Sequence, residues 1–229
     1  DATADVQIVD AKWGFDGHVR PKTFVPLRIV IKNRGTQNLT LRLRLTRADA
    51  LNAVGEALEQ EFLLAAETSR VVQMVPFVSD PGETWTLRWG DADEDSYSIK
   101  STSADDGIVL ITSRSELSSQ SGFLSTMPED EFPTSVTALD ALRYLFLDRE
   151  PRWPLPRRVA FEEWLIKGGV VVILNQNDGK RPEFVELPFL NTQGRANRYG
   201  QGLIVRLERN PSSMTRAFLE SEILGRAMT

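Results

Sequence analysis

The chain has 229 residues, of which 41% are apolar and 26% charged, with 27 Lys+Arg against 32 Asp+Glu. This composition is typical of folded globular proteins, and the length is sufficient for two domains. The sequence contains no Cys and a single His, His18. These counts exclude disulfides, Cys-ligated metal sites and a thiol nucleophile.

Acidic residues outnumber basic residues in both halves of the chain. Residues 1–103 contain 12 basic and 15 acidic side chains, and residues 104–229 contain 15 and 17. Because neither half is basic, we expect no nucleic-acid surface. The longest apolar run, Gly169–Leu174, is far shorter than the roughly 20 residues that cross a bilayer. Any signal peptide or membrane anchor would therefore lie outside this sequence.

The first domain, residues 1–103, is predicted to be an all-β sandwich. Apolar and polar residues alternate with period 2, as in antiparallel strands that have one wet face. Between residues 48 and 66 the composition favours a helix, but Gly55 interrupts it, and a strand near Leu58–Leu64 is the preferred interpretation. The other expected strands are Val6–Val9, Phe24–Asn33, Leu39–Thr46, Val71–Val75 and Trp85–Trp89.

The second domain, residues 104–229, alternates strands and helices, which predicts a parallel α/β sheet. A helix over Pro154–Lys167 is expected to end at Gly168-Gly169, and Asn210-Pro211 is expected to begin a last helix. The expected strands are Gly107–Thr112, Leu142–Leu147, Val170–Leu174 and Gly202–Leu207.

Four segments, in this order, resemble a group of bacterial cell-envelope proteins. These proteins carry an immunoglobulin-like β-sandwich followed by a class I glutamine-amidotransferase-like domain, and transmembrane helices usually tether them. The matching segments are Phe24–Gly35, Leu139–Asp148, Phe161–Val172 and Tyr199–Val205. The resemblance implies an immunoglobulin-like sandwich followed by a flavodoxin-like three-layer α/β domain. It also implies an extracytoplasmic location.

The sequence departs from the active family at the catalytic site. An amidotransferase needs a Cys nucleophile on a strand-to-helix elbow and a His that activates it. The elbow should follow Val170–Leu174, where this chain has Asn175, Gln176 and Asn177, and no His follows residue 18. We therefore expect a vestigial elbow, no catalytic residues and no glutamine hydrolysis.

Several polar residues follow the predicted parallel strands, where open α/β sheets bind ligands. Ser113, Asp148 and Asn175 are the candidate lining of a ligand pocket. Ser113 or Ser115 is a weak nucleophile without a base, and a loop or capping role is preferred. Asp148 could pair with Asp105 or Asp106 for acid/base or metal chemistry, although a surface loop aspartate is the simpler interpretation.

Two further features have a structural and a functional interpretation. The acidic residues of Asp91–Asp95 alternate as in a calcium loop, but Ser96 and Thr102 replace the Gly and Glu that such a loop requires, so a hairpin turn is preferred. His18 has no partner that spacing can identify, and a structural or exposed role is expected. We expect neither a metal site nor a cofactor.

Aromatic residues supply the candidate surfaces for recognition. Arg152, Trp153 and Arg157 lie in a proline-rich segment and form a candidate protein contact, because Trp and Arg dominate binding hot spots. The preferred interpretation is that this segment leads into the helix, with Trp153 folded onto its own domain, because Trp is usually largely buried. The indoles of Trp13, Trp85 and Trp89 would suit a sugar-binding face, but packing in the sandwich is preferred.

The prediction for the whole chain is a non-catalytic interaction or scaffold region of a membrane-tethered envelope protein, with another envelope protein as its partner. The alternative is a module that binds a small ligand or a carbohydrate, either at the α/β strand ends or through the sandwich Trp residues. An enzyme with carboxylate or serine chemistry is the third possibility.

Overall fold

The structure is a computed structural model that describes residues 5–15, 17–48, 57–80, 82–90, 95–101, 107–111, 125–176 and 178–209. The chain divides into two compact units, Asp1–Asp105 and Asp106–Thr229. The sequence had placed the domain boundary between residues 103 and 104.

The N-terminal unit consists of antiparallel strands in two main sheets. One sheet has the order β1-β3-β6 and the other has the order β5-β4-β8-β9, while β2 and β7 form a two-stranded ribbon. The strands are β1 (Val6–Trp13), β2 (Thr23–Phe24), β3 (Leu27–Asn33), β4 (Leu39–Ala48), β5 (Leu58–Leu64), β6 (Ser69–Met74), β7 (Phe77–Val78), β8 (Thr84–Trp89) and β9 (Asp95–Lys100).

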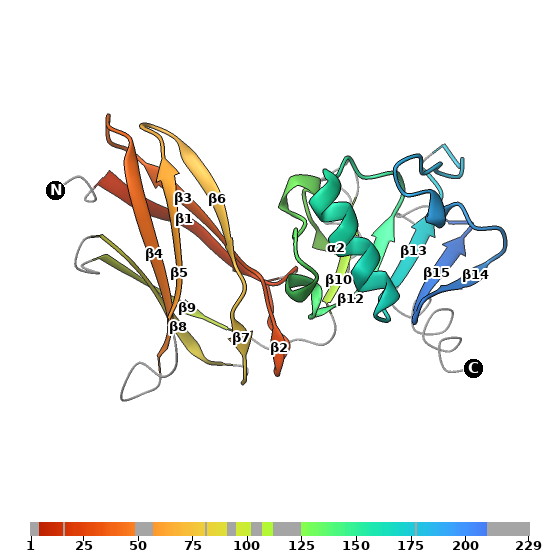
Figure 1. Cartoon of the computed structure of the whole chain (residues 1–229), viewed down its shortest axis with the longest axis horizontal. Coiled ribbons are helices and arrows are strands. Elements are labelled where there is room, and N and C mark those ends of the chain that lie inside the picture. The colour runs from red at the N-terminus through yellow and green to blue at the C-terminus, as the bar shows by residue number, and fades with distance from the viewer. Residues whose placement is uncertain are drawn as a thin grey trace. The chain divides into compact units, whose positions relative to one another are not determined.

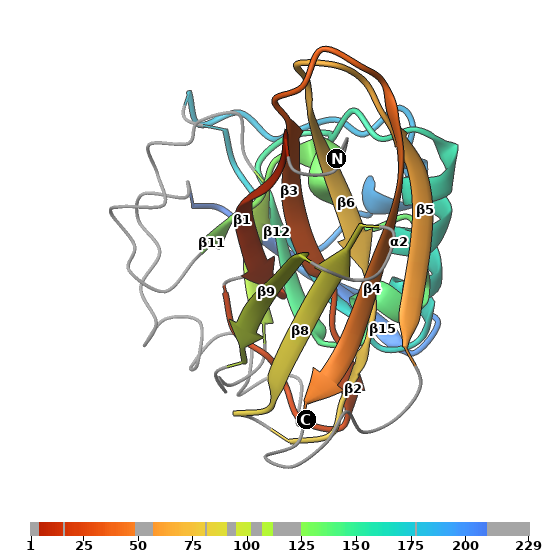
Figure 2. The same ribbon diagram turned by 90° about the vertical axis from the view of Figure 1, so that its left-hand side faces the viewer.

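The two sheets of this unit lie face to face and enclose one apolar core (Figure 2). Alternate residues of β3 and β4 are fully buried, as period-2 strands require, and they come from both sheets. Trp13 of β1 and Trp85 of β8 meet across the core, with ring centroids 5.8 Å apart. The prediction of a β-sandwich is confirmed. The expected strand Leu58–Leu64 is present as β5, with Phe62 and Leu64 buried.

The C-terminal unit contains a six-stranded sheet with the order β11-β10-β12-β13-β15-β14. All neighbouring pairs are parallel except β14 and β15, which are antiparallel. The described elements are β10 (Gly107–Ile111), β11 (Ser125–Thr126), β12 (Leu142–Leu147), β13 (Val170–Leu174), β14 (Ala196–Tyr199), β15 (Gly202–Leu207), helix α2 (Leu155–Ile166) and three short 3-10 helices, η3 (Glu129–Glu131), η4 (Val136–Leu139) and η5 (Pro188–Leu190).

Helix α2 lies across one face of this sheet (Figure 1). The indole Nε1 of Trp164 donates a hydrogen bond to the carbonyl oxygen of Leu142 at 2.8 Å, which fixes the helix to β12. Gly168 has a φ of +117°, which is in the region that glycine tolerates best, and it ends the helix as predicted. The strands that the sequence predicted at Leu142–Leu147, Val170–Leu174 and Gly202–Leu207 are confirmed.

The predicted three-layer, flavodoxin-like architecture is not supported. Such an architecture needs helices on both faces of the sheet. Within the described ranges, α2 is the single α-helix, and the described part of the chain is mostly strand. The helix expected after Asn210 lies outside the described residues.

Candidate functional site

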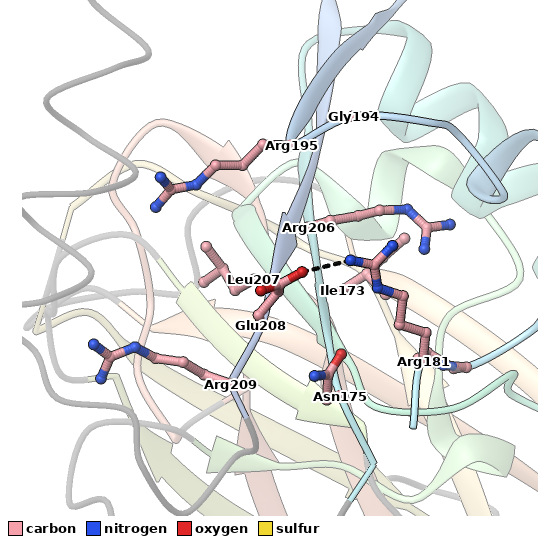
Figure 3. A pocket seen from close by; sticks show the side chains of 10 residues that line it. Ile173, Asn175, Arg181, Gly194, Arg195, Arg206, Leu207, Glu208 and Arg209 are labelled. Carbon is pink, nitrogen blue, oxygen red and sulfur yellow. Dashed lines mark hydrogen bonds and ion pairs between the residues drawn. The ribbon is translucent and has the colours of Figure 1, made fainter. Parts of the chain in front are cut away.

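A cleft of about 540 Å³ opens where β13 and β15 end, at the carboxyl edge of the parallel sheet (Figure 3). Open α/β sheets bind ligands at this edge because the loops that leave the strands supply polar groups there. The cleft is lined by Ile173, Asn175, Arg181, Pro182, Gly194, Arg195, Arg206, Leu207, Glu208 and Arg209. Arginine is the commonest residue of this lining, which makes the cleft a candidate site for an anion.

Arg206 is the central cation of the cleft. It is the penultimate residue of the otherwise apolar strand β15, and its side chain is partly buried. One Nη donates to the carbonyl oxygen of Leu190 at 2.6 Å, whereas the buried Nε has no hydrogen-bond partner among the described residues. Burial, and to a lesser degree the nearby Arg181 cation, lowers the pKa of Arg206.

The charge of Arg206 is therefore not compensated within the described structure. No carboxylate of the described residues lies within ion-pair distance of its guanidinium group. A charge that is partly removed from water is stabilised by a partner of opposite charge. An anion that entered the cleft would supply the missing partner.

Arg181 and Glu208 form an ion pair at the mouth of the cleft. Arg181 Nη2 donates to Glu208 Oε1 at 2.5 Å, and the two side chains are 64% and 77% exposed. An ion pair with this exposure contributes about 0–1 kcal/mol to stability, so Arg181 can exchange its partner at little cost. Figure 3 shows the two side chains joined on the same side of the strand as Arg206.

The other two arginines of the lining do not converge on this point. In Figure 3 the guanidinium groups of Arg195 and Arg209 extend to the side opposite those of Arg181 and Arg206. Residues 206 and 208 share one face of the strand end, and residue 209 takes the other, as period 2 requires. The candidate anion site therefore consists of Arg206, Arg181, Glu208 and the Asn175 amide.

The predicted vestigial elbow does not have the geometry of a nucleophile elbow. The N–H of Gly179 donates to the carbonyl oxygen of Gln176 at 2.9 Å, and the N–H of Gln176 donates to the carbonyl oxygen of Lys180 at 2.8 Å. The chain thus reverses in a tight turn, with Gly179 at a φ of +81°. No α-helix begins between residues 178 and 187, so the elbow prediction is wrong for Asn175 and Gln176, and Asn177 lies outside the described residues.

Of the predicted pocket residues Ser113, Asp148 and Asn175, the structure places only Asn175 in the cleft. Asp148 follows β12 and is 5% exposed, but it does not line the cleft. Ser113, Ser115, Asp105 and Asp106 lie outside the described residues.

Of the candidate protein contact formed by Arg152, Trp153 and Arg157, the structure removes Trp153, because this residue is buried. Trp153 is 4% exposed, its ring stacks on Phe132 with centroids 4.2 Å apart, and its Nε1 donates to the carbonyl oxygen of Glu129. Arg157 Nε donates to the carbonyl oxygen of Phe132 at 2.6 Å. The Trp153 ring is therefore part of the core of its own unit, and Arg152 is the exposed member of the set.

The sandwich tryptophans do not form a sugar-binding face. Trp13, Trp85 and Trp89 are 3%, 5% and 6% exposed. On β8, Trp85, the fully buried Leu87 and Trp89 occupy every second position. They therefore share the face of the strand that points into the sandwich. This packing was the preferred interpretation of the sequence. The other N-terminal candidate, His18, is exposed.

The acidic segment Asp91–Asp95 joins two antiparallel strands. Asp95 pairs with Trp89 in the β8–β9 register, as the predicted hairpin requires, and residues 91–94 lie outside the described residues. Within the described ranges, no group of three His, Cys, Asp or Glu side chains could hold a metal ion.

The sequence analysis missed Arg181, Arg206 and Glu208. One signal was available, because Arg206 interrupts the apolar run Gly202–Leu207 at the carboxyl end of a predicted buried strand. A charged residue at such a position needs a partner or a ligand. Arg181 and Glu208 come from two separate loops, and nothing in their sequence spacing brings them together.

Comparison with known proteins assigns no family. No family model matches the chain, and no curated protein matches it. The chain is similar to part of a cycloisomaltooligosaccharide glucanotransferase from Paenibacillus sp., with 10% identity, a TM-score of 0.35, and coverage of 74% of this chain and 28% of that chain. A putative β-galactosidase from Bacteroides fragilis gives 9% identity, a TM-score of 0.32, and coverage of 73% and 38%.

A β-glucuronidase from Bacteroides uniformis gives 11% identity, a TM-score of 0.29, and coverage of 74% of this chain and 22% of that chain. The chain thus spans well under half the length of these proteins. At such identities and TM-scores, the similarities assign neither a family nor an activity. Among the described residues, no helix has the length and apolar character needed to cross a membrane.

Proposed function

We propose that this chain is a non-catalytic binding module that holds an anionic ligand in the cleft at the carboxyl ends of β13 and β15. The observation that carries the proposal is the partly buried Arg206, whose Nε has no hydrogen-bond partner and whose charge has no carboxylate partner among the described residues. An anion bound there would supply the missing charge partner. The exposed Arg181 adds a second cation within reach of the same ligand.

The volume of the cleft supports a small molecule as the ligand. About 540 Å³ lies inside the range of roughly 300–1,000 Å³ that is usual for small-molecule sites. The arginine fork also suits carboxylate and phosphate groups, because it can donate two parallel hydrogen bonds to either.

Calorimetric titration with inorganic phosphate, at constant ionic strength, tests this proposal. We expect saturable binding that weakens by roughly ten- to a hundredfold in Arg206→Gln, since a hydrogen bond to a charged group contributes about 1.5–3 kcal/mol. Arg198→Gln is the matched control, because it removes the same charge from an exposed position on β14 outside the cleft. The proposal fails if phosphate does not bind, or if both variants lose the same affinity.

The proposal of a non-catalytic role rests on the missing nucleophile and base. The chain has no Cys, its single His belongs to the N-terminal unit, and β13 leads into a turn. Incubation of the purified protein with glutamine should release no ammonia above the blank. Ammonia release that depends on the protein would contradict the non-catalytic role.

The resemblance in the sequence extends the proposal to the cellular context. We propose that the sandwich is immunoglobulin-like and that the C-terminal unit shares the strand order of a doubly wound sheet, though not, within the described residues, its helical layers. The parallel strands β10, β11, β12, β13 and β15 follow one another along the chain, and their order in the sheet is β11-β10-β12-β13-β15. This corresponds to the order 2-1-3-4-5 of one common type of doubly wound sheet. A bacterial envelope location, anchoring by segments outside this chain and an interaction with another envelope protein are proposed on the resemblance alone.

A further inference from the structure

Glu208 is an unexpected member of an anion site. It lies two residues after Arg206 on the same face of the strand end, and its Oε1 accepts the hydrogen bond from Arg181. A ligand held by Arg206 and Arg181 would therefore lie beside a carboxylate. This carboxylate repels a second anionic group and weakens the binding of a ligand that has no hydrogen-bond donor.

The same carboxylate favours ligands that carry donors close to their anionic group. An ionised carboxylate only accepts hydrogen bonds, and Glu208 Oε2 has no partner among the described residues. The Asn175 amide lies on the same side of the strand end (Figure 3) and offers both a donor and an acceptor. A hydroxyl group can donate a hydrogen bond to Glu208 and can either donate to or accept from the Asn175 amide.

The remaining lining limits the size and shape of the ligand. Ile173, which pairs with Arg206 across the sheet and is 2% exposed, and the buried Pro182 supply the apolar part of the lining. The whole cleft, on both sides of the strand end, has about 540 Å³, which is much more than an inorganic anion needs. A compact ring whose carbon face is apolar and whose edge carries hydroxyls fits this mixture of surfaces.

We infer that the ligand is a hydroxylated anion of about monosaccharide size, whose anionic group lies between Arg206 and Arg181 and whose hydroxyls bond to Glu208 and Asn175. This inference rests on the proposed function and adds the chemical class of the ligand to it. Both a sugar acid and a sugar phosphate have this chemistry, and the test distinguishes them.

The test compares four probes by calorimetry at constant ionic strength. They are glucuronate, glucose 6-phosphate, glucose and cyclohexanecarboxylate, which respectively carry hydroxyls with a carboxylate, hydroxyls with a phosphate, hydroxyls alone and a carboxylate alone. We expect glucuronate or glucose 6-phosphate to bind roughly tenfold or more tightly than either single-feature probe, since a hydrogen bond to a charged group contributes about 1.5–3 kcal/mol. The tighter of the two identifies the anionic group.

The variant Glu208→Leu links this preference to the structure. Its side chain is exposed, so we expect the protein to fold, and the far-ultraviolet circular dichroism spectrum checks this. In the unmodified protein, glucuronate or glucose 6-phosphate binds more tightly than cyclohexanecarboxylate. In the variant this preference should fall by roughly tenfold, because the charged acceptor is lost and Asn175 is the one remaining partner for the hydroxyls.

Three results would overturn the inference. The first is equal affinity for glucuronate, glucose 6-phosphate and cyclohexanecarboxylate in the unmodified protein. The second is a preference of the same size in Glu208→Leu. The third is binding of glucose as tight as that of the anions. If inorganic phosphate binds in an Arg206-dependent manner but none of the four probes binds, the proposed function stands and the proposed ligand class is rejected.

Discussion

At the scale of single residues, Asn33 is a buried polar side chain that connects two parts of the sandwich. It is fully buried at the end of β3, and its Nδ2 donates to the carbonyl oxygens of Gln37 and Ala65 at 2.8 and 3.2 Å. Its Oδ1 accepts the N–H of Gly35 at 2.9 Å. The side chain thus joins the turn after β3 to the loop after β5.

We predict that Asn33→Ala lowers the free energy of unfolding by about 2–3 kcal/mol, because it removes three hydrogen bonds made by a fully buried side chain. Urea denaturation followed by circular dichroism measures this loss. Asn38→Ala is the control, since the Asn38 side chain accepts a single hydrogen bond at an exposed site and should cost about 1 kcal/mol or less. Equal losses in the two variants would contradict the prediction.

The sequence analysis placed Asn33 at the end of an expected strand but did not identify it as the link between two loops. The Asn33-Arg34-Gly35 run is a local signal, whereas Ala65 lies 32 residues further along the chain. The burial of Trp85 was easier to predict, because Trp85 and Leu87 are two residues apart in a strand and therefore share one face. The role of Arg206 depends on loops that only the folded chain brings to it.

At the scale of elements, the contact between α2 and the sheet depends on glycines. A Cβ at Gly202 would lie 1.9 Å from the carbonyl oxygen of Leu165, which belongs to the helix backbone. A Cβ at Gly169 would lie 2.4 Å from the ring of Trp164. The helix therefore packs directly on the backbone of β15 at its first residue.

We predict that Gly202→Ala lowers the free energy of unfolding by about 1–3 kcal/mol or more, since the helix must move to admit one methyl group. Thermal and urea denaturation measure the loss. Gln201→Ala is the neighbouring control, because its side chain is exposed and such a change stays within about 0.5 kcal/mol. A Gly202→Ala variant as stable as the control would show that the helix is not in direct contact with the strand.

Long, regular elements were predictable from the sequence, and short edge strands were not. Helix α2, β12, β13 and β15 have strong apolar patterns over five or more residues. In contrast, β2, β7, β11 and β14 have two to four residues, which is too few for a period to be recognised. The loop after β13 was expected to lead into a helix because the family resemblance implied one, but its own residues form a turn.

At the scale of the whole molecule, the chain consists of two units with separate hydrogen-bonded sheets. Every sheet in the described structure draws its strands from one unit only. Each unit also has its own buried core, around Leu43 and Leu87 in one and around Phe146 and Phe161 in the other. The lengths of both units lie within the usual range of domains that fold alone, about 50–250 residues.

We predict that a fragment of residues 1–105 folds cooperatively without the rest of the chain. The edge-to-face pair of Trp13 and Trp85 is held rigidly in its core, so the fragment should keep the near-ultraviolet circular dichroism of those indoles and lose it in a single urea transition. The variant Leu43→Ala in the same fragment is the control. It removes a fully buried side chain and should lower the midpoint by an amount equivalent to about 2–5 kcal/mol. A fragment with no indole signal, or with a broad transition that Leu43→Ala does not move, would mean that the sandwich needs the C-terminal unit in order to fold.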